Sequence, residues 1–238
     1  MSARKITTKV LSRLAWKIAK YGLFFFFSST ILVTLIYKFM PVYVTPLMLI
    51  RCYQQHEAGD TMRLKKTWVP IEKISPNLPR AVVASEDNNF MHHHGFDFDA
   101  IMAAAHKNFE GEKVQGGSTI SQQTAKNVFL WPSRNWIRKG LESYFTVLIE
   151  IFWSKERIME VYLNVIEMGD GIYGAEAASQ AYYYHPAVDL TRTQAALIAA
   201  ALPAPLHRNP GYPNNYMWHR CAQIKRVMRK MGPLNLNQ

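Results

Sequence analysis

The sequence predicts an all-α domain that follows a single apolar membrane segment. Three observations carry this prediction: apolar residues recur at helical spacing along most of the chain after Pro79, capping residues precede several of these segments, and no alternating strand pattern or repeat is present. The chain has 238 residues, of which 49% are hydrophobic and 13% aromatic. This length and composition suit one membrane segment and one folded core, and they argue against disorder.

The first 51 residues hold most of the excess positive charge. They contain eight of the 28 basic residues and none of the 17 acidic ones, and the formal net charge of the whole chain is +11. A basic segment beside apolar sequence is suited to an anionic membrane surface. The distribution of charge therefore argues against nucleic acid as a partner.

An uncharged, apolar stretch covers residues 21–37 and predicts a transmembrane helix. Its seventeen residues are at the short end for a bilayer span, but Lys20 and Lys38 can extend to the interface. No small-residue cleavage site follows, so an uncleaved signal anchor over residues 21–40 is favoured over a cleaved signal peptide. The basic residues of segment 1–20 then place the N-terminus in the cytoplasm and the rest of the chain outside the cytoplasmic membrane.

The remaining sequence divides into a connector and a helical domain. Residues 41–78 are rich in proline and are interpreted as an irregular connector with a short amphipathic piece, and residues 79–238 as the domain. Its helices are expected from Pro79, which suits a first helical position, from Asp97 to Gly111, from Ser118, over about residues 136–153, from Ser154, from the capping box at Thr191 to Pro203, and over about residues 214–231.

Glu86 and Asp87 form the first candidate site. They follow the apolar run Ala81–Ala84 and precede Phe90, so at least one carboxylate is expected against a partly apolar wall. Burial there would raise the pKa of the carboxyl group and make it a better general base. The alternative is a solvated helix end, which is the usual location of adjacent acids.

Histidines and cysteines give no metal site in the sequence. Residues 92–94 are three consecutive histidines, which cannot all point at one ion on a helix, and no second ligand cluster follows them. One imidazole that bonds a neighbouring carboxylate or caps the turn is expected instead. Cys52 and Cys221 are too few for a disulfide framework, and two unpaired cysteines are favoured over one bridge.

A second cluster of polar residues lies where a helix is expected to begin, at Ser118. In that helix Thr119, Gln123, Lys126 and Asn127 share one face. A helix N-terminus with free amides, a hydroxyl group and a lysine is suited to bind pyrophosphate. An ordinary polar helix face is the alternative.

Arg138, Lys139 and Glu142 form the third cluster. Arg138 and Glu142 are i, i+4 neighbours, a spacing that usually gives a surface ion pair of a few tenths of a kcal/mol. In a cleft, the same pair would keep Glu142 charged.

These clusters resemble, in content and in order, the motifs of peptidoglycan glycosyltransferases. The matching segments are Glu86-Asp-x-x-Phe-x-x-His-x-Gly95, Gly117-Ser-Thr-Ile-Ser-Gln-Gln-Thr-Ala-Lys-Asn127, Arg138-Lys-x-x-Glu142, Lys155-Glu-Arg-Ile-Met-Glu-Val-Tyr-Leu-Asn164 and Ala195-Ala-Leu-Ile-Ala-Ala-Ala-Leu-Pro203. Five motifs in this order resemble glycosyltransferase family 51, whose members polymerise lipid II into glycan strands. The chain resembles the monofunctional biosynthetic members, because it has no room for a transpeptidase domain. The extra histidines around His93 depart from the family pattern, which needs only that one.

The resemblance implies a lysozyme-like, two-lobed helical fold in which residues 41–78 contribute to a membrane-proximal jaw. It implies Glu86 as the general base on the 4-hydroxyl group of the acceptor sugar, and Glu142 as a second essential carboxylate near the donor phosphates. The substrate-binding residues that it implies are Asp87, Phe90, His93, Ser118, Thr119, Gln123, Lys126, Asn127, Arg138, Lys139 and Asn164.

The resemblance also implies partners and a location. The expected partners are lipid II, the growing glycan strand, the cytoplasmic membrane and other cell-wall synthesis or division proteins. The expected location is the bacterial inner membrane, with the catalytic domain in the periplasm. A divalent cation, Mg²⁺ or Mn²⁺, is the one candidate cofactor, at the donor pyrophosphate, and its ligands are left unassigned.

Two other functions compete with this interpretation. A lytic transglycosylase or muramidase would share a lysozyme-like fold and a catalytic glutamate, but it would not need a lysine-bearing pyrophosphate site or a membrane anchor. A non-catalytic, membrane-anchored partner of the cell-wall machinery would not need both Glu86 and Glu142.

Overall fold

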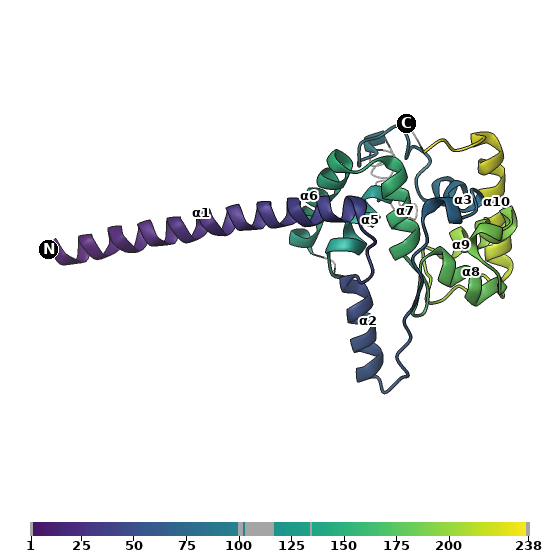
Figure 1. Cartoon of the computed structure of the whole chain (residues 1–238), viewed down its shortest axis with the longest axis horizontal. Coiled ribbons are helices and arrows are strands. Elements are labelled where there is room, and N and C mark those ends of the chain that lie inside the picture. The colour runs from purple at the N-terminus through teal and green to yellow at the C-terminus, as the bar shows by residue number, and fades with distance from the viewer. Residues whose placement is uncertain (1, 100–101, 103–116, 134, 237–238) are drawn as a thin grey trace. The chain divides into compact units, whose positions relative to one another are not determined.

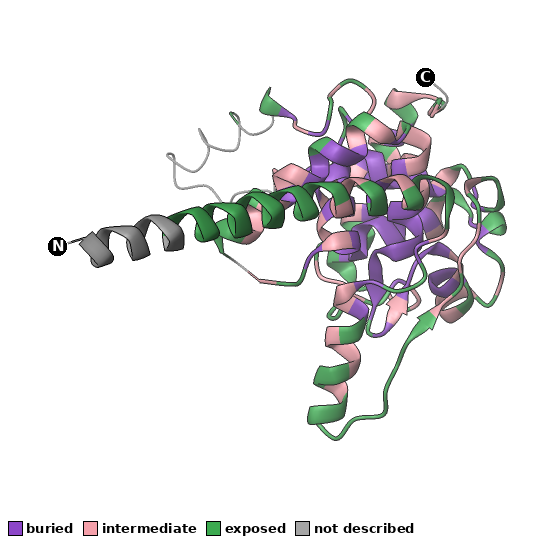
Figure 2. Ribbon diagram, turned by 60° about the vertical axis from the view of Figure 1, so that its left-hand side comes forward, coloured by how far each residue is buried: buried purple, intermediate pink, exposed green. Residues whose placement is uncertain are grey.

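A computed structural model describes residues 2–99, 102, 117–133 and 135–236 of the chain. It divides into two units, Met1–Met40 and Pro41–Gln238. The first unit contains one continuous helix, α1 (Ser2–Phe39), of which the part Ser12–Phe39 is long and apolar enough to cross a membrane. Figure 2 shows this part exposed along most of its length, as a lipid-facing helix requires.

The second unit is mainly helical, which confirms the all-α prediction (Figure 1). Among its described residues the helices are α2 (Pro46–Glu57), α3 (Asn77–Glu86), α5 (Ile120–Phe129), α6 (Trp136–Phe152), α7 (Lys155–Val165), α8 (Ala175–Tyr183), α9 (Arg192–Ala201) and α10 (Asn215–Met231), with short 3-10 helices η1 (Ile71–Lys73) and η2 (Ala187–Asp189). The amphipathic piece expected in the connector is α2. The helix expected from Asp97 to Gly111 lies mostly outside the described residues.

Side-chain caps set the starts of most of these helices. Ser154 caps α7, and Thr191 caps α9 through a capping box, both as the sequence predicts. The expected cap at Ser118 is wrong by one residue: Thr119 caps α5, because Gln122 stands at the position where it completes a capping box. The expected start at Pro79 is also wrong. The helix begins at Asn77, and proline is tolerated there because the first turn needs no backbone N–H.

A small sheet, which the sequence does not predict, joins the connector to the rest of the second unit. It contains β1 (Lys65–Lys66), β2 (Glu167–Gly169) and β3 (Ile172–Tyr173) in the order β1-β3-β2. The β1–β3 pair is parallel and the β2–β3 pair antiparallel. Strands of two or three residues are too short to show alternation in the sequence.

Two groups of helices form the core of the second unit. Helices α3, α9 and α10 pack together in one group, and α5 packs against α6 and α7 in the other (Figure 1). Buried residues gather inside these groups, whereas the far end of α2 is exposed (Figure 2). The C-terminal end of α3 is joined to the start of α5 by the hydrogen bonds described next.

Candidate active site

Glu86 is the last residue of α3 and has neutral hydrogen-bond partners. Its carboxylate accepts from the Gln123 Nε2 over 3.1 Å and from the Ser85 Oγ over 3.2 Å. Burial raises the pKa of the Glu86 carboxyl group, and the Gln123 bond, the Ser85 bond and the charge of Arg220 lower it in part. Burial therefore acts on the Glu86 carboxyl group in the direction that the sequence predicts for one of the two acids.

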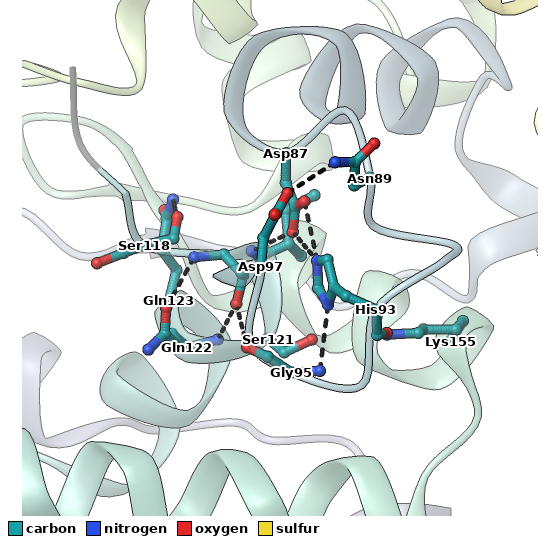
Figure 3. Close-up of polar contacts among 12 residues, drawn as sticks. Asp87, Asn89, His93, Gly95, Asp97, Ser118, Ser121, Gln122, Gln123 and Lys155 are labelled. Atoms are coloured by element: carbon teal, nitrogen blue, oxygen red, sulfur yellow. Dashed lines mark hydrogen bonds and ion pairs between the residues drawn. The ribbon is translucent and has the colours of Figure 1, made fainter. Parts of the chain in front are cut away.

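Asp87 ties the loop after α3 to the start of α5 (Figure 3). Its carboxylate lies 2.9 Å from the His93 Nε2 and accepts from the Ile120 backbone N over 2.9 Å. The Gly95 N donates to the His93 Nδ1 over 3.1 Å, so Nε2 carries the proton and donates to Asp87. The imidazole–carboxylate contact that the sequence predicts is confirmed.

The buried Phe90 lies beside this network. The Lys155 Nζ sits 4.7 Å from the centre of the Phe90 ring and donates to the His93 carbonyl oxygen over 2.7 Å. Lys155 also bonds Glu150 over 2.8 Å. These contacts hold the loop after α3 in one shape.

The start of α5 is held by its own cap. The Thr119 hydroxyl donates to the Gly95 carbonyl oxygen over 2.7 Å and accepts from the Gln122 N, and the residue is only 3% exposed. The Ser118 carbonyl oxygen accepts from the Gln123 Nε2 over 3.4 Å. This cap places Gln123, the fourth residue of α5, against Glu86.

A cavity of about 620 Å³ lies next to this arrangement. Four residues that the sequence singles out line it: Gln123, Lys126, Asn127 and Arg138. Burial lowers the pKa of the Lys126 ammonium group, the charge of Glu142 raises it, and the charges of Arg138 and Lys139 lower it again. The cavity wall therefore carries cations that are short of solvent and suited to bind an anion.

Glu142 is bonded by two cations of its own helix. It is 3% exposed, and its carboxylate accepts from the Arg138 Nη1 over 2.6 Å and from the Lys139 Nζ. The spacings are i, i+4 and i, i+3 along α6. Glu142 therefore fixes Arg138, which lines the cavity, in one orientation.

Asn164 lies elsewhere. Its side chain is fully buried, and its amide bonds the backbone N and O of Val69, each over 2.9 Å, and the Glu160 carbonyl oxygen. These contacts join α7 to the connector, and Asn164 is not among the residues that line the cavity.

Four residues near the site carry no assignment from the sequence. Arg51 on α2 and Glu167 on β2 line the cavity and pair over 3.4 Å. Arg220 on α10 donates to the Ser85 carbonyl oxygen over 3.3 Å, beside Glu86. Tyr162 on α7 bonds Gln123. Tyr162 lies within the family motif Lys155–Asn164. The other three lie outside the motifs, and the sequence does not show that their segments fold against the site.

The site as a whole suits group transfer from an anionic leaving group. Glu86 can take up a proton, and the adjacent cavity offers Lys126 and Arg138 to a departing negative charge. Chemically, this arrangement is suited to an acid–base transferase with an anion-binding cavity.

Comparisons with known proteins agree with this class. The family described as Transglycosylase matches residues 54–232. The chain is 57% identical over 215 residues to a biosynthetic peptidoglycan transglycosylase of Bacteroides thetaiotaomicron, covering 89% of this chain and 87% of the relative. It is 51% identical over 208 residues to the protein of that name from Bdellovibrio bacteriovorus, covering 87% and 82%, and 44% identical over 223 residues to that from Pseudomonas putida, covering 94% of each. The chain belongs to the transglycosylase family.

Proposed function

We propose that this chain is a peptidoglycan glycosyltransferase that polymerises lipid II into β-1,4-linked glycan strands and releases undecaprenyl pyrophosphate. One observation carries the proposal: a half-buried carboxyl group with a raised pKa, Glu86, is bonded through Gln123 to the helix that presents Lys126 to the cavity. Family membership and the names of the relatives support it.

Glu86 acts on the acceptor. In its charged form it removes the proton from the 4-hydroxyl group of the acceptor sugar, while the hydroxyl oxygen attacks the anomeric carbon of the donor. The new bond is the β-glycosidic C–O bond, and the bond that breaks joins the anomeric carbon to the pyrophosphate oxygen. An α-linked donor and a β-linked product require one inverting displacement and no covalent enzyme intermediate. The proton ends on Glu86, and the electron pair ends on the pyrophosphate.

The cations of α5 and α6 act on the donor. Lys126 and Arg138 line the cavity and stabilise the charge that grows on the departing pyrophosphate. Glu142 holds Arg138 and Lys139 in place, and therefore acts on the donor through them. Asp87 and His93 join the loop that follows Glu86 to the start of α5.

A divalent cation, Mg²⁺ or Mn²⁺, at the donor pyrophosphate stays a prediction, and the described residues limit how the protein could hold it. The described part of the chain contains no group of three or more His, Cys, Asp or Glu residues that could hold a metal ion. Glu142, the carboxylate nearest the proposed donor cations, is already bonded by Arg138 and Lys139. A divalent cation there would therefore be held mainly by the phosphate oxygens of the donor, and no step of the reaction is assigned to it.

The helix α1 supplies the proposed membrane anchor, with the N-terminus in the cytoplasm and residues 41–238 in the periplasm. The basic residues before the span support this orientation, and the apolar side chains exposed on and before α2 support contact with the membrane surface. Lipid II and the nascent strand are the proposed partners there, together with other cell-wall synthesis proteins.

The test is polymerisation by the purified protein. Detergent-solubilised full-length chain is incubated with labelled lipid II, and the product is treated with a muramidase. Polymer that the muramidase degrades is the expected result. Cleavage of preformed glycan strands, with no polymer from lipid II, would instead indicate a lytic enzyme, and neither activity would indicate a non-catalytic partner.

A further inference from the structure

Tyr162 on α7 lies beside the site but has no part in the mechanism above. Its side chain is fully buried, and its hydroxyl donates to the Gln123 Oε1 over 3.1 Å. The Nε2 of the same amide donates to the Glu86 Oε2 over 3.1 Å. One amide group therefore joins a buried tyrosine to the carboxylate that is proposed as the base.

The contacts of this amide favour one of its two orientations. Its Nε2 faces two acceptors, the Glu86 carboxylate and the Ser118 carbonyl oxygen, and its Oε1 faces the Tyr162 hydroxyl. The reverse orientation would bring the amide oxygen against both acceptors. Burial, and then the charges of Glu86 and Asp87, raise the pKa of Tyr162 well above its ordinary value, so the hydroxyl keeps its proton and acts as a donor.

We propose that Tyr162 is a positioning residue for the general base, because it holds the Gln123 amide with its NH₂ group on Glu86. The inference rests on the proposed role of Glu86. A hydrogen bond donated to a carboxylate favours its charged form, which is the form that removes a proton from the acceptor. Tyr162 thus offsets part of the effect of burial on Glu86 without contacting the substrate.

Several other groups also face Glu86 and stay in place when Tyr162 is changed. Arg220 on α10 lowers the pKa of Glu86, Asp87 raises it, and the Ser85 hydroxyl donates to it. Lys126, on the same helix as Gln123, is coupled to Glu86 by charge. A change in the pH profile that follows substitution of Tyr162 therefore reports on the amide.

The first test is Tyr162→Phe, which removes the hydroxyl and keeps the ring. We expect the acidic limb of kcat/KM against pH to move up by about one pH unit, the scale of one hydrogen bond to a carboxylate. Activity should then fall about 10-fold on the acidic side and much less at high pH. Tyr183→Phe is the matched control, since it removes a hydroxyl that bonds the Pro210 carbonyl oxygen away from Glu86, and it should leave the limb in place.

A double-mutant cycle decides whether Tyr162 acts through Gln123. Gln123→Ala should move the acidic limb in the same direction, and adding Tyr162→Phe to it should move the limb no further. An additional shift of the same size in that background would overturn the proposal, as would an unchanged limb in Tyr162→Phe itself. If the limb is unchanged in Tyr162→Phe and Glu86→Gln is inactive, the role proposed for Tyr162 is wrong and that of Glu86 stands. If Glu86→Gln is active, Glu86 is not the base.

A second variant covers the case in which Tyr162→Phe does not fold. Replacing Tyr162 by 3-fluorotyrosine keeps the hydroxyl and nearly the same volume, and makes the hydroxyl a stronger donor. The Gln123 amide is then polarised more strongly, so the acidic limb should move to lower pH. A limb that stays in place or moves to higher pH would overturn the proposal.

Discussion

Glu86 and Glu142 are both glutamates near the candidate cavity, and they have opposite kinds of partner. Glu86, at the end of α3, is bonded by the neutral amide of Gln123 and the neutral hydroxyl of Ser85. Glu142, within α6, is bonded by the cations Arg138 and Lys139. Burial raises the pKa of Glu86, whereas the negative charge of Glu142 is balanced within its own helix.

This difference in partners separates two roles for one type of side chain. A carboxylate with neutral partners can take up a proton and release it, which general-base catalysis requires. A carboxylate paired with two cations instead fixes those cations in space. Environments that differ in this way are the usual means by which one active site divides its work between two acids.

The largest expected effect comes from Glu86→Gln. Glutamine keeps the shape, and its one amide oxygen can still accept from the Gln123 Nε2, but it cannot take up the proton, so polymerisation of lipid II should fall by at least ~100-fold. Because the pKa of Glu86 is raised in the fold, its contribution to stability is present below its ordinary pKa and is lost as pH rises through the raised value. The variant should therefore melt at or above the wild-type Tm at neutral pH.

The control for Glu86→Gln is Glu72→Gln, which changes an exposed glutamate in η1. It should alter neither the polymerisation rate nor the Tm. Polymer synthesis at a near-normal rate by Glu86→Gln would show that Glu86 is not the base, and the proposed difference in role between Glu86 and Glu142 would be wrong.

Glu142→Gln should also lower activity strongly, but with the opposite effect on stability. It leaves Arg138 and Lys139 without a counter-charge. The cost to folding should be roughly 2 kcal/mol, below the usual range for breaking a buried pair because Lys139 is 41% exposed. A disordered Arg138 should weaken binding of a phosphoglycolipid inhibitor of the moenomycin type, as measured by fluorescence anisotropy.

Glu160→Gln is the matched control for Glu142→Gln. It breaks an i, i+3 pair with Arg157 at 2.7 Å, with both side chains largely buried, outside the cavity lining. It should therefore lower the Tm without changing inhibitor affinity. If Glu142→Gln leaves both inhibitor affinity and rate unchanged, Glu142 has no part in the site.

Contacts between residues that are close in the sequence could be predicted from the sequence. The pairing of Arg138 with Glu142 follows from their i, i+4 spacing, and the contact of one histidine with a neighbouring acid follows from adjacency. The helices follow from apolar periodicity and caps. The error at the start of α5 arises because Ser118 and Thr119 are adjacent hydroxyl residues, and only the full geometry shows which one caps.

Contacts between residues that are far apart in the sequence could not be predicted from one sequence. Gln123 reaches Glu86 from 37 positions away, and Tyr162 reaches Gln123 from 39. Arg51 and Glu167 stand 116 positions apart, in a connector and in a three-residue strand. Periodicity reports which face of an element is buried but not which element it meets, so these contacts need the fold.

Removing residues 1–40 tests whether the different roles of Glu86 and Glu142 depend on the membrane anchor. Both carboxylates lie in the second unit, so the truncated chain should fold and should keep the opposite stability effects of the two substitutions. Its rate on lipid II in membranes should fall roughly 10-fold, because the anchor concentrates the enzyme near its substrate.

The truncated chain should still bind liposomes or detergent. Tyr43, Leu49 and Tyr53 expose 66%, 61% and 63% of their surface on and before α2. A truncated protein that ignores liposomes in a flotation assay, and polymerises as fast as the intact chain, would show that neither α1 nor α2 contributes in this way.

The smallest expected effect on activity comes from alanine substitutions at two helix caps of the same type. Thr119 and Thr191 both form capping boxes, with Gln122 and Gln194, but only α5 carries Gln123 to Glu86. Alanine at Thr191 should cost about 1 kcal/mol of stability, measured by denaturant unfolding. Alanine at Thr119 should cost more, because the buried Thr119 hydroxyl also donates to the Gly95 carbonyl oxygen. Thr119→Ala should in addition lower polymerisation a few-fold and raise the acidic limb of its pH profile, because Gln123 loses its fixed position. Inhibitor affinity should hold in Thr191→Ala, whereas in Thr119→Ala it reports whether Lys126, on the same helix as Gln123, keeps its position. Equal activity in both would show that Glu86 does not depend on the start of α5.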